Sequence, residues 1–235
     1  MKVQVASGLR ELIRNEYPNG ERIPTEYELA DMLGVSRGTV SQALAMLTSE
    51  GLVLRKQGSG TYTNPNILRL SVRADRPFQI NGLIESAGYS PSVDLIEHEV
   101  SSADAETAAL LDIPVHSDVL VVRRVFLADD EPAVYLVDRL SADIITVAYK
   151  TEDLEKLLFH VLPDRCGVYL SYTLSNLIPS VATERVAGLL KINLGTPLLQ
   201  CNDTHYDIDN RPIVYSTIYY SDKKLRFSVM RKIHM

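Results

Sequence analysis

The segment SRGTVSQAL, residues 36–44, combines one arginine with several hydroxyl and amide side chains at helical spacing. Ser36 can cap the start of a helix by accepting a hydrogen bond from a free backbone N–H. Arg37 and Thr39 then lie on the outer face of the first turn, opposite the apolar positions. A guanidinium group can donate two parallel hydrogen bonds to guanine, and threonine can contact a thymine methyl group or a phosphate. These residue types at this spacing are typical of a helix that reads the major groove of DNA.

A shorter helix is expected just before this segment. Thr25 and Glu28 have the spacing of a capping box, in which each side chain accepts a hydrogen bond from the other residue's backbone N–H. Gly34 can supply the turn that follows. Two helices joined by a turn of about three residues form a helix-turn-helix, which leaves the first turn of the second helix protruding. The residues expected to face inward are Leu29, Met32 and Leu33 in the first helix, and Val40, Ala43, Leu44 and Leu47 in the second.

A hairpin is expected directly after the helices, with strands at 52–56 and 61–63 around the tip QGSG. Arg55 and Lys56 lead into this glycine-rich tip, which can approach a phosphate backbone or a minor groove. Two other interpretations remain open: a hairpin that only packs on the helices, and a helical scaffold that binds a protein partner. Basic residues beside a flexible tip favour a wing that contacts DNA, so the sequence predicts a winged helix.

The stretch from Pro24 to Thr63, PTEYELADMLGVSRGTVSQALAMLTSEGLVLRKQGSGTYT, resembles the DNA-binding domain of the GntR family of bacterial transcription regulators. The resemblance implies that Arg37 and Thr39 contact operator bases or phosphates. The family often has arginine at two positions where this chain has Tyr27 and Ser41, so its operator or its affinity should differ from the commonest ones. The residues expected at the DNA interface are Arg37, Thr39, Ser36, Gln42, Tyr27, Ser41, Arg55, Lys56, Gly58 and Gly60.

The rest of the chain is expected to form a second domain of the α+β class. Residues 1–64 form the winged helix, 65–77 a linker with proline at both ends, and 78–235 the second domain. Hairpin-linked strands indicate a mainly antiparallel sheet with helices on it. The expected helices are 78–87, 105–111, 154–161 and 183–190, and the expected strands are 93–100, 119–127, 133–139, 167–178, 198–208, 212–220 and 227–233.

Two pieces of this second domain look alike: VLVVRRVFLADDEPAVYLVDRL and PLLQCNDTHYDIDNRPIVYSTIYY. Each is a strand, a turn with acidic residues and a proline, and a second strand, which suggests a pseudo-repeat. The order of the elements resembles the UTRA effector-binding domain, which has the chorismate lyase-like fold and accompanies the HutC subfamily of GntR regulators. The resemblance implies a site for a small effector, often an anionic metabolite.

Aligning LADDEP with the family's L-A-D-G-x-P places Arg124 at the first arginine of a frequent R-x-R motif and Phe126 at the second. The resemblance also implies that Ser92 lies near the effector. Replacement of family glutamates by tyrosine and valine favours a less polar or aromatic anion, held by Arg124 and a tyrosine-lined wall. Two alternatives remain: the tyrosines belong to the core, and Arg124 pairs with a nearby acid. The residues expected at this site are Arg124, Ser92, Phe126, Tyr135, Tyr172, Tyr206, Tyr215 and Asp153.

Composition narrows the function class. Residues 1–64 carry seven basic and seven acidic residues, so the whole net charge of −6 lies beyond them and argues against nonspecific coating of nucleic acid. No apolar run is long enough to span a membrane. The two cysteines and five histidines have no metal-ligand spacing, and no cofactor loop is present, so no cofactor and no metal are expected.

Together these patterns predict a cytoplasmic transcription regulator that is not an enzyme. It is expected to repress by binding a two-fold operator in double-stranded DNA as a homodimer, and to release the operator when a small anionic metabolite binds the second domain. Two alternatives are a DNA-binding regulator whose second domain only dimerises, and a lyase-like enzyme tethered to DNA.

Overall fold

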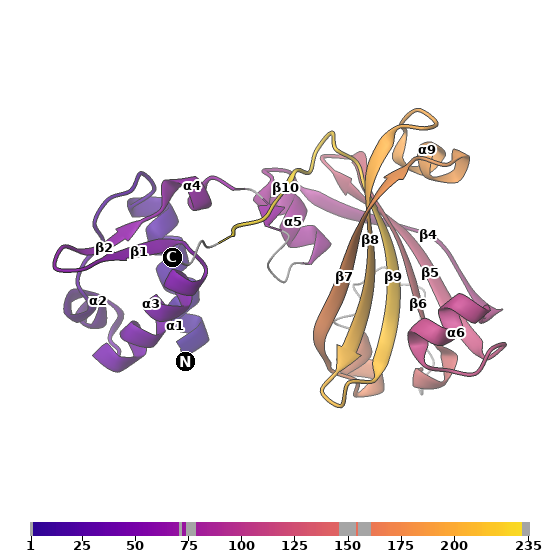
Figure 1. Ribbon diagram of the computed structural model, residues 1–235, viewed down its shortest axis with the longest axis horizontal. Coiled ribbons are helices and arrows are strands. Elements are labelled where there is room, and N and C mark those ends of the chain that lie inside the picture. Colours follow the sequence, from indigo (N-terminus) through magenta and orange to yellow (C-terminus); the bar gives the residue numbers. More distant parts are fainter. Residues whose placement is uncertain (1, 71, 74–78, 146–153, 155–160, 232–235) are drawn as a thin grey trace. The chain divides into compact units, whose positions relative to one another are not determined.

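The computed structural model describes residues 2–70, 72–73, 79–145, 154 and 161–231 (Figure 1). The chain divides into two compact units. The first consists of Met1–Arg76 together with Phe227–Met235, and the second of Pro77–Arg226. The second unit is therefore an insertion in the first, and both of its ends connect to the first unit.

Three helices form the body of the first unit: α1 (Lys2–Glu16), α2 (Glu26–Leu33) and α3 (Arg37–Ser49). Both α1 and α2 pack on α3. Their apolar side chains form one core because each helix buries a single stripe. As the sequence predicts, this core contains Leu29, Val40, Ala43, Leu44 and Leu47, and α1 adds Ala6, Leu9 and Ile13.

The predicted inward face of α2 is wrong at two positions. Met32 is 57% exposed and Leu33 is 37% exposed, whereas Leu29 is fully buried. The reason is the turn after the helix, where Gly34 takes a left-handed conformation with φ of 63°. That turn brings the N–H of Val35 back to the carbonyl of Ala30, and the side chain of Val35 packs against the core.

The wing consists of β1 (Val53–Lys56) and β2 (Gly60–Thr63), which pair in antiparallel fashion. The segment before α2 lies alongside β2 and is joined to it by two backbone hydrogen bonds. The N–H of Ile23 donates to the carbonyl of Thr61, and the N–H of Thr63 donates to the carbonyl of Glu21. The pairing of β1 with β2 confirms the predicted hairpin, and backbone hydrogen bonds join the wing to the segment before α2.

The segment expected as a linker is partly regular structure. It contains helix α4 (Pro65–Leu68) and strand β3 (Val72–Arg73), and Ile67 and Leu68 pack against the core of the first unit. Strand β10 (Phe227–Ser228) pairs in parallel with β3. The sequence assigned this last strand to the second domain, but the structure pairs it with a strand of the first unit.

Two further contacts hold these strands on the first unit. The guanidinium of Arg73 donates to the carbonyl of Glu50, the residue that caps the C-terminal end of α3, at 2.5 Å. The side chain of Met230, just beyond β10, lies so close to Gly51 that a Cβ built there would be 2.3 Å from its sulfur. Gly51 has φ of 76°, a conformation that glycine adopts without strain. We call β3 together with 227–231 the strap.

The second unit is a six-stranded antiparallel sheet in the order β4-β5-β6-β9-β8-β7, which confirms the predicted α+β class. Its helices are α5 (Ile80–Ser86), α6 (Ala105–Leu111) and α9 (Glu184–Leu190), with short turns η1 (Ala142–Ile144) and η2 (Leu162–Cys166). The strands are β4 (Pro91–Ser102), β5 (Asp118–Ala128), β6 (Glu131–Ser141), β7 (Leu170–Val181), β8 (Pro197–Asp207) and β9 (Pro212–Tyr220). The helix predicted at 154–161 falls mostly outside the described residues.

The pseudo-repeat is visible in the topology. A strand, a helix and a hairpin occur twice, as β4-α6-β5-β6 and β7-α9-β8-β9, and β6 meets β9 at the centre. Corresponding elements start at 91 and 170, 105 and 184, and 118 and 197, so the two copies keep the same spacing. The two edges of the sheet, β4 and β7, are thus equivalent positions in the two halves.

The two faces of this sheet bury different groups. One face packs under α6 and α9 through a cluster that includes Val121, Val125, Tyr135 and Tyr215. The opposite face carries a second apolar cluster, with Leu120, Leu140 and Val214 packed against Leu154 and Leu162. Alternation along each strand assigns side chains to one face or the other.

Candidate DNA-binding site and effector domain

Helix α3 begins with a well-formed cap. The side chain of Ser36 accepts a hydrogen bond from the N–H of Thr39 at 3.2 Å, and the two hydroxyl oxygens lie 2.9 Å apart. The capping box of α2 is also formed, between Thr25 and Glu28. The burial of one face of α3 in the core leaves the opposite face of its first two turns available, where Arg37 is 74% exposed at its side chain.

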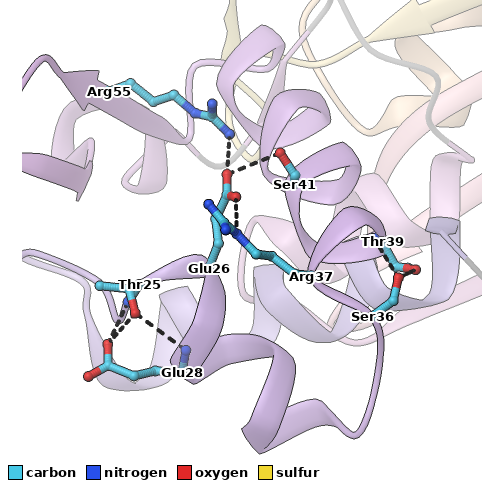
Figure 2. A network of polar contacts seen from close by, with 8 residues as sticks. All are labelled: Thr25, Glu26, Glu28, Ser36, Arg37, Thr39, Ser41 and Arg55. Carbon is cyan, nitrogen blue, oxygen red and sulfur yellow. Dashed lines mark hydrogen bonds and ion pairs between the residues drawn. The ribbon is translucent and has the colours of Figure 1, made fainter.

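One carboxylate joins three elements at this surface (Figure 2). Glu26, the first residue of α2, lies 3.5 Å from Nε of Arg37 on α3 and 3.1 Å from Nη2 of Arg55 on β1. The hydroxyl of Ser41 donates to the same carboxylate at 3.1 Å. Glu26 therefore holds cations from the helix and the wing on one side of the first unit.

Glu26 was missed by the sequence reasoning, which noticed only its neighbours in the capping box. A signal for it exists, because an acidic residue in the first turn of a helix is favoured by the helix dipole and lies near the preceding loop. What the sequence lacks is the packing of α2 across α3, which alone brings Glu26 to Arg37 and Arg55. Exposed ion pairs of this type contribute little to folding stability. We therefore attribute to Glu26 the orientation of the two arginine side chains.

The structure places the other predicted DNA-binding residues on the same unit but not all around Glu26. Tyr27 is 77% exposed, and Gln42 is exposed on α3. Lys56 lies over the ring of Tyr62 at 4.3 Å from its centroid. The wing tip contains Gly58 and Gly60, with φ of 73° and 119°. At Gly60 a side chain would also collide with Arg22, since a Cβ there would lie 2.6 Å from its Nε.

In the second unit, Arg124 is fully buried and already has an acidic partner. Its guanidinium is ion-paired with Asp138, whose other oxygen accepts from Ser216. Ser216 is 3.2 Å from Nε2 of His205, and Nδ1 of His205 is 2.8 Å from the hydroxyl of Thr173. We call these five residues the polar row; it crosses five neighbouring strands on the face away from α6 and α9.

The ion pair between Arg124 and Asp138 affects the anion site that the sequence predicts around Arg124. Sequence reasoning left open whether Arg124 binds an anion or pairs with an acid, and the structure has it paired with Asp138. A buried guanidinium neutralised in this way has little capacity left to attract an anion. Phe126 is also fully buried on this face, with its ring centroid 5.9 Å from the guanidinium carbon of Arg124.

The predicted tyrosine wall is not brought together around Arg124. Tyr135 and Tyr215 belong to the cluster under α6 and α9, on the opposite face. The register explains this, because Arg124 pairs with Leu136 while Tyr135 pairs with Val125, one residue out of step. Tyr135 and Tyr215 are core residues, which is the alternative that the sequence leaves open.

Three further predicted effector residues, Tyr172, Tyr206 and Ser92, lie within the described part of the chain. Tyr172 and Tyr206 stack on each other with centroids 4.9 Å apart, and the hydroxyl of Tyr172 donates to Asn210 beyond the end of β8. Ser92 is exposed near the start of β4. Asp153 lies outside the described residues.

Burial controls the ionisation of groups near the polar row. It raises the pKa of the Asp203 carboxyl to about 6, an effect increased by the charge of Asp138 and opposed by a hydrogen bond from Ser175. Burial raises the pKa of the Cys201 thiol to about 12 and lowers that of the His205 imidazole. A low-dielectric site favours the neutral form of each of these three groups.

Among the residues that the structure describes, no helix is long and apolar enough to cross a membrane. Among the same residues, no group of three or more histidine, cysteine, aspartate or glutamate side chains is arranged to hold a metal ion.

Comparison with known proteins agrees with this architecture. Residues 1–63 match the description "Bacterial regulatory proteins, gntR family", and residues 86–226 match the UTRA domain. The transcriptional regulator Rv0792c of Mycobacterium tuberculosis is 28% identical over 96% of this chain and 84% of its own length. The transcriptional repressor NagR of Bacillus subtilis is 28% identical over 84% of this chain and 82% of its own length.

Solved structures show the same fold. The possible transcriptional regulator YydK of Bacillus subtilis has a TM-score of 0.80 at 20% identity, covering 98% of this chain and 99% of its own. PhnF of Mycobacterium smegmatis has a TM-score of 0.63 at 24% identity, covering 98% of this chain and 100% of its own. Both alignments run through the two units.

A winged helix with an exposed, capped helix α3, joined to an α+β sheet domain, defines a DNA-binding transcription regulator. The chain belongs to the GntR family of bacterial regulators, in the group that carries a UTRA domain. The matching families and the relatives are regulators and not enzymes, in agreement with the expectation from the sequence.

Proposed function

We propose that this protein is a cytoplasmic repressor that binds a two-fold operator as a homodimer and releases it when a small molecule binds the second unit. The observation that carries the proposal is the first turn of α3, where Arg37 is exposed, held by Glu26, and adjacent to the capped Thr39. A helix presented in this way fits a major groove, and a two-fold operator matches two such helices in a dimer. The names of several relatives, including NagR and the probable fructoselysine repressor of Escherichia coli, support repression.

We propose a small-molecule effector, but we do not propose that it is an anion. The expectation of an anion rested on Arg124, and that guanidinium is buried against Asp138. An effector would change operator affinity by binding one arrangement of the protein better than another. A coupling free energy of about 1–3 kcal/mol corresponds to roughly a 5- to 150-fold change in operator affinity.

The test is fluorescence anisotropy of the full chain with DNA from upstream of its own gene, against random DNA and across a salt series. Wild type is expected to prefer the upstream DNA, and Arg37→Ala to weaken that binding by about 1–3 kcal/mol. Arg14→Ala is the matched control, because Arg14 is exposed near the end of α1 and lies outside the helix-turn-helix. Equal binding of upstream and random DNA, or an equal effect of both substitutions, would contradict recognition by α3.

A further inference from the structure

The surface expected to contact DNA carries less effective positive charge than its sequence suggests. Two of the three cations expected there, Arg37 and Arg55, lie within ion-pair distance of one carboxylate, that of Glu26 (Figure 2). The third, Lys56, lies over the ring of Tyr62, which is a neutral group. The charges of the two arginines are therefore partly neutralised in the absence of DNA.

The carboxylate of Glu26 is the less accessible partner in both ion pairs. Its side chain is 25% exposed, whereas those of Arg37 and Arg55 are 74% and 47% exposed. The hydroxyl of Ser41 also donates to this carboxylate, at 3.1 Å, and this contact depends on neither arginine. Glu26 therefore stays beside the two guanidinium groups when DNA approaches them from solvent.

A DNA phosphate meets Glu26 as a like charge. Cations that bind phosphates release the counterions of DNA, and this contribution to affinity does not depend on base sequence. A phosphate that contacts Arg37 or Arg55 comes close to the Glu26 carboxylate across the same guanidinium, and the two anions repel each other. Glu26 therefore weakens phosphate contacts on DNA of any sequence.

A guanine base avoids this repulsion. Its major-groove edge presents two uncharged acceptors, O6 and N7, which pair with two nitrogens of one guanidinium. Glu26 contacts Arg37 through Nε, at 3.5 Å, and this contact does not use the two terminal nitrogens. Arg37 can therefore bind guanine while it remains paired with Glu26.

We propose that Glu26 is a specificity-determining residue, which weakens the binding of this surface to DNA phosphates and leaves Arg37 able to bind guanine. It raises the ratio of operator binding to random binding because it lowers random binding more. This ratio matters because random sites in a genome greatly outnumber operators. The effect on the ratio rests on the proposed function, whereas the effect on phosphate binding does not.

The test compares wild type with Glu26→Gln by fluorescence anisotropy of the full chain across a salt series, with random duplex DNA and with the upstream DNA. Gln keeps an oxygen that accepts from Ser41 but has no charge. We expect Glu26→Gln to bind random DNA roughly 5- to 10-fold more tightly at about 0.1 M salt, with a salt slope steeper by about 1, because one more cation becomes available to phosphate. Its preference for the upstream DNA should fall at least about threefold.

Asp31→Asn is the matched control, because Asp31 is exposed on the same helix and the substitution removes the same charge. It is expected to bind random DNA like wild type. Circular dichroism checks that each variant folds.

A second comparison leaves Glu26 unchanged and uses two neighbours on β1. Arg55→Ala should weaken the binding of random DNA less than Lys56→Ala, because Glu26 already offsets the charge of Arg55. This comparison decides the question if Glu26→Gln does not fold.

Three results would overturn the inference: no gain of Glu26→Gln on random DNA, an equal gain of Asp31→Asn, or a loss for Arg55→Ala as large as that for Lys56→Ala. The two DNAs separate this inference from the proposed function. A wild type that prefers no DNA, together with a gain of Glu26→Gln on random DNA, contradicts the proposed function alone. A wild type that prefers the upstream DNA, without that gain, contradicts this inference alone.

Discussion

At the scale of single residues, the molecule uses two acidic side chains in opposite ways. Glu26 is part-exposed and lies between the guanidinium groups of Arg37 and Arg55, where it orients them without a large energy. Asp203 is buried, and one of its oxygens has no hydrogen-bond partner. A buried carboxylate without full compensation costs free energy when it is ionised, so Asp203 should oppose folding at neutral pH.

This cost predicts the effect of Asp203→Asn on stability. The folded-state pKa of about 6 lies above the ordinary aspartate value of 3.8, so the folded protein holds the proton more tightly than the unfolded chain. The free energy of unfolding should therefore fall as pH rises from 3.8 to about 6 and stay lower above it. Asn, which cannot ionise, should stabilise the protein by about 1–3 kcal/mol at pH 7.

Urea unfolding of wild type and Asp203→Asn, measured from acidic to neutral pH, checks this prediction. The difference between the two proteins should shrink as the pH falls towards 4, because both then carry a neutral group at this position. Asp222→Asn serves as the control, since Asp222 is exposed. A constant difference across the pH range would show that the substitution acts through packing instead of charge.

At the scale of elements, the sequence predicted what depends on local spacing and missed what depends on contacts between elements. The capping box at Thr25, the cap at Ser36 and the hairpin glycines follow from short-range rules, and all of them are present. Glu26 gains its role only through packing of α2 on α3. Of the strap, the sequence predicted a strand at 227–233 but neither β3 nor its pairing with β10, because a two-residue strand such as β3 has no periodic pattern.

The predicted arrangement of the effector site in the second unit was wrong for a related reason. The sequence predicted one wall of four tyrosines beside Arg124, formed by Tyr135, Tyr172, Tyr206 and Tyr215. Tyr135 instead lies on the opposite face, because it is one residue out of step with the partner of Arg124 in the strand register. The partner of Arg124 is Asp138, which lies on the next strand and follows a turn. Register across a hairpin with an irregularity at Phe126 and Leu127 cannot be counted from the sequence alone.

The contact between the strap and the end of α3 can be tested with paired glycines. Gly51 and Gly58 both have positive φ, 76° and 73°, so alanine should cost about 1–2 kcal/mol of backbone strain at either position. Only Gly51→Ala also displaces Met230, whose sulfur would lie 2.3 Å from the new Cβ. We expect Gly51→Ala to be more destabilising than Gly58→Ala, by about 1 kcal/mol.

Denaturant unfolding in a double-mutant cycle measures that difference. In the background of Met230→Ala, the cost of Gly51→Ala should drop to that of Gly58→Ala, because the displaced side chain is gone. A cost that does not depend on residue 230 would mean that the strap contributes nothing at Gly51. Gly58 is the appropriate reference because a Cβ there would have no neighbour within 4 Å.

At the scale of the whole molecule, the inserted second unit is attached to the first at both of its ends. The chain leaves the first unit after β3 and re-enters it at β10, and these two strands pair with each other. Arg73 on β3 and Met230 after β10 contact Glu50 and Gly51, where α3 ends. Within the first unit, the strands next to both connections are therefore held at the end of α3.

This arrangement predicts how the chain unfolds when its last segment is removed. Two compact units should give two transitions in calorimetry, and Gly58→Ala identifies the transition of the first unit by lowering it. A chain that ends at Arg226 lacks β10 and Met230, which pair with β3 and pack at Gly51. A loss of about 1 kcal/mol in a unit of this size corresponds to a fall of roughly 4–8 °C in its Tm. In the truncated chain, the Tm of the transition marked by Gly58→Ala should fall by this amount. The Tm of the other transition should stay within about 1 °C of its value in the full chain. A shift of the other transition would instead assign the last segment to the second unit, as the sequence alone suggested.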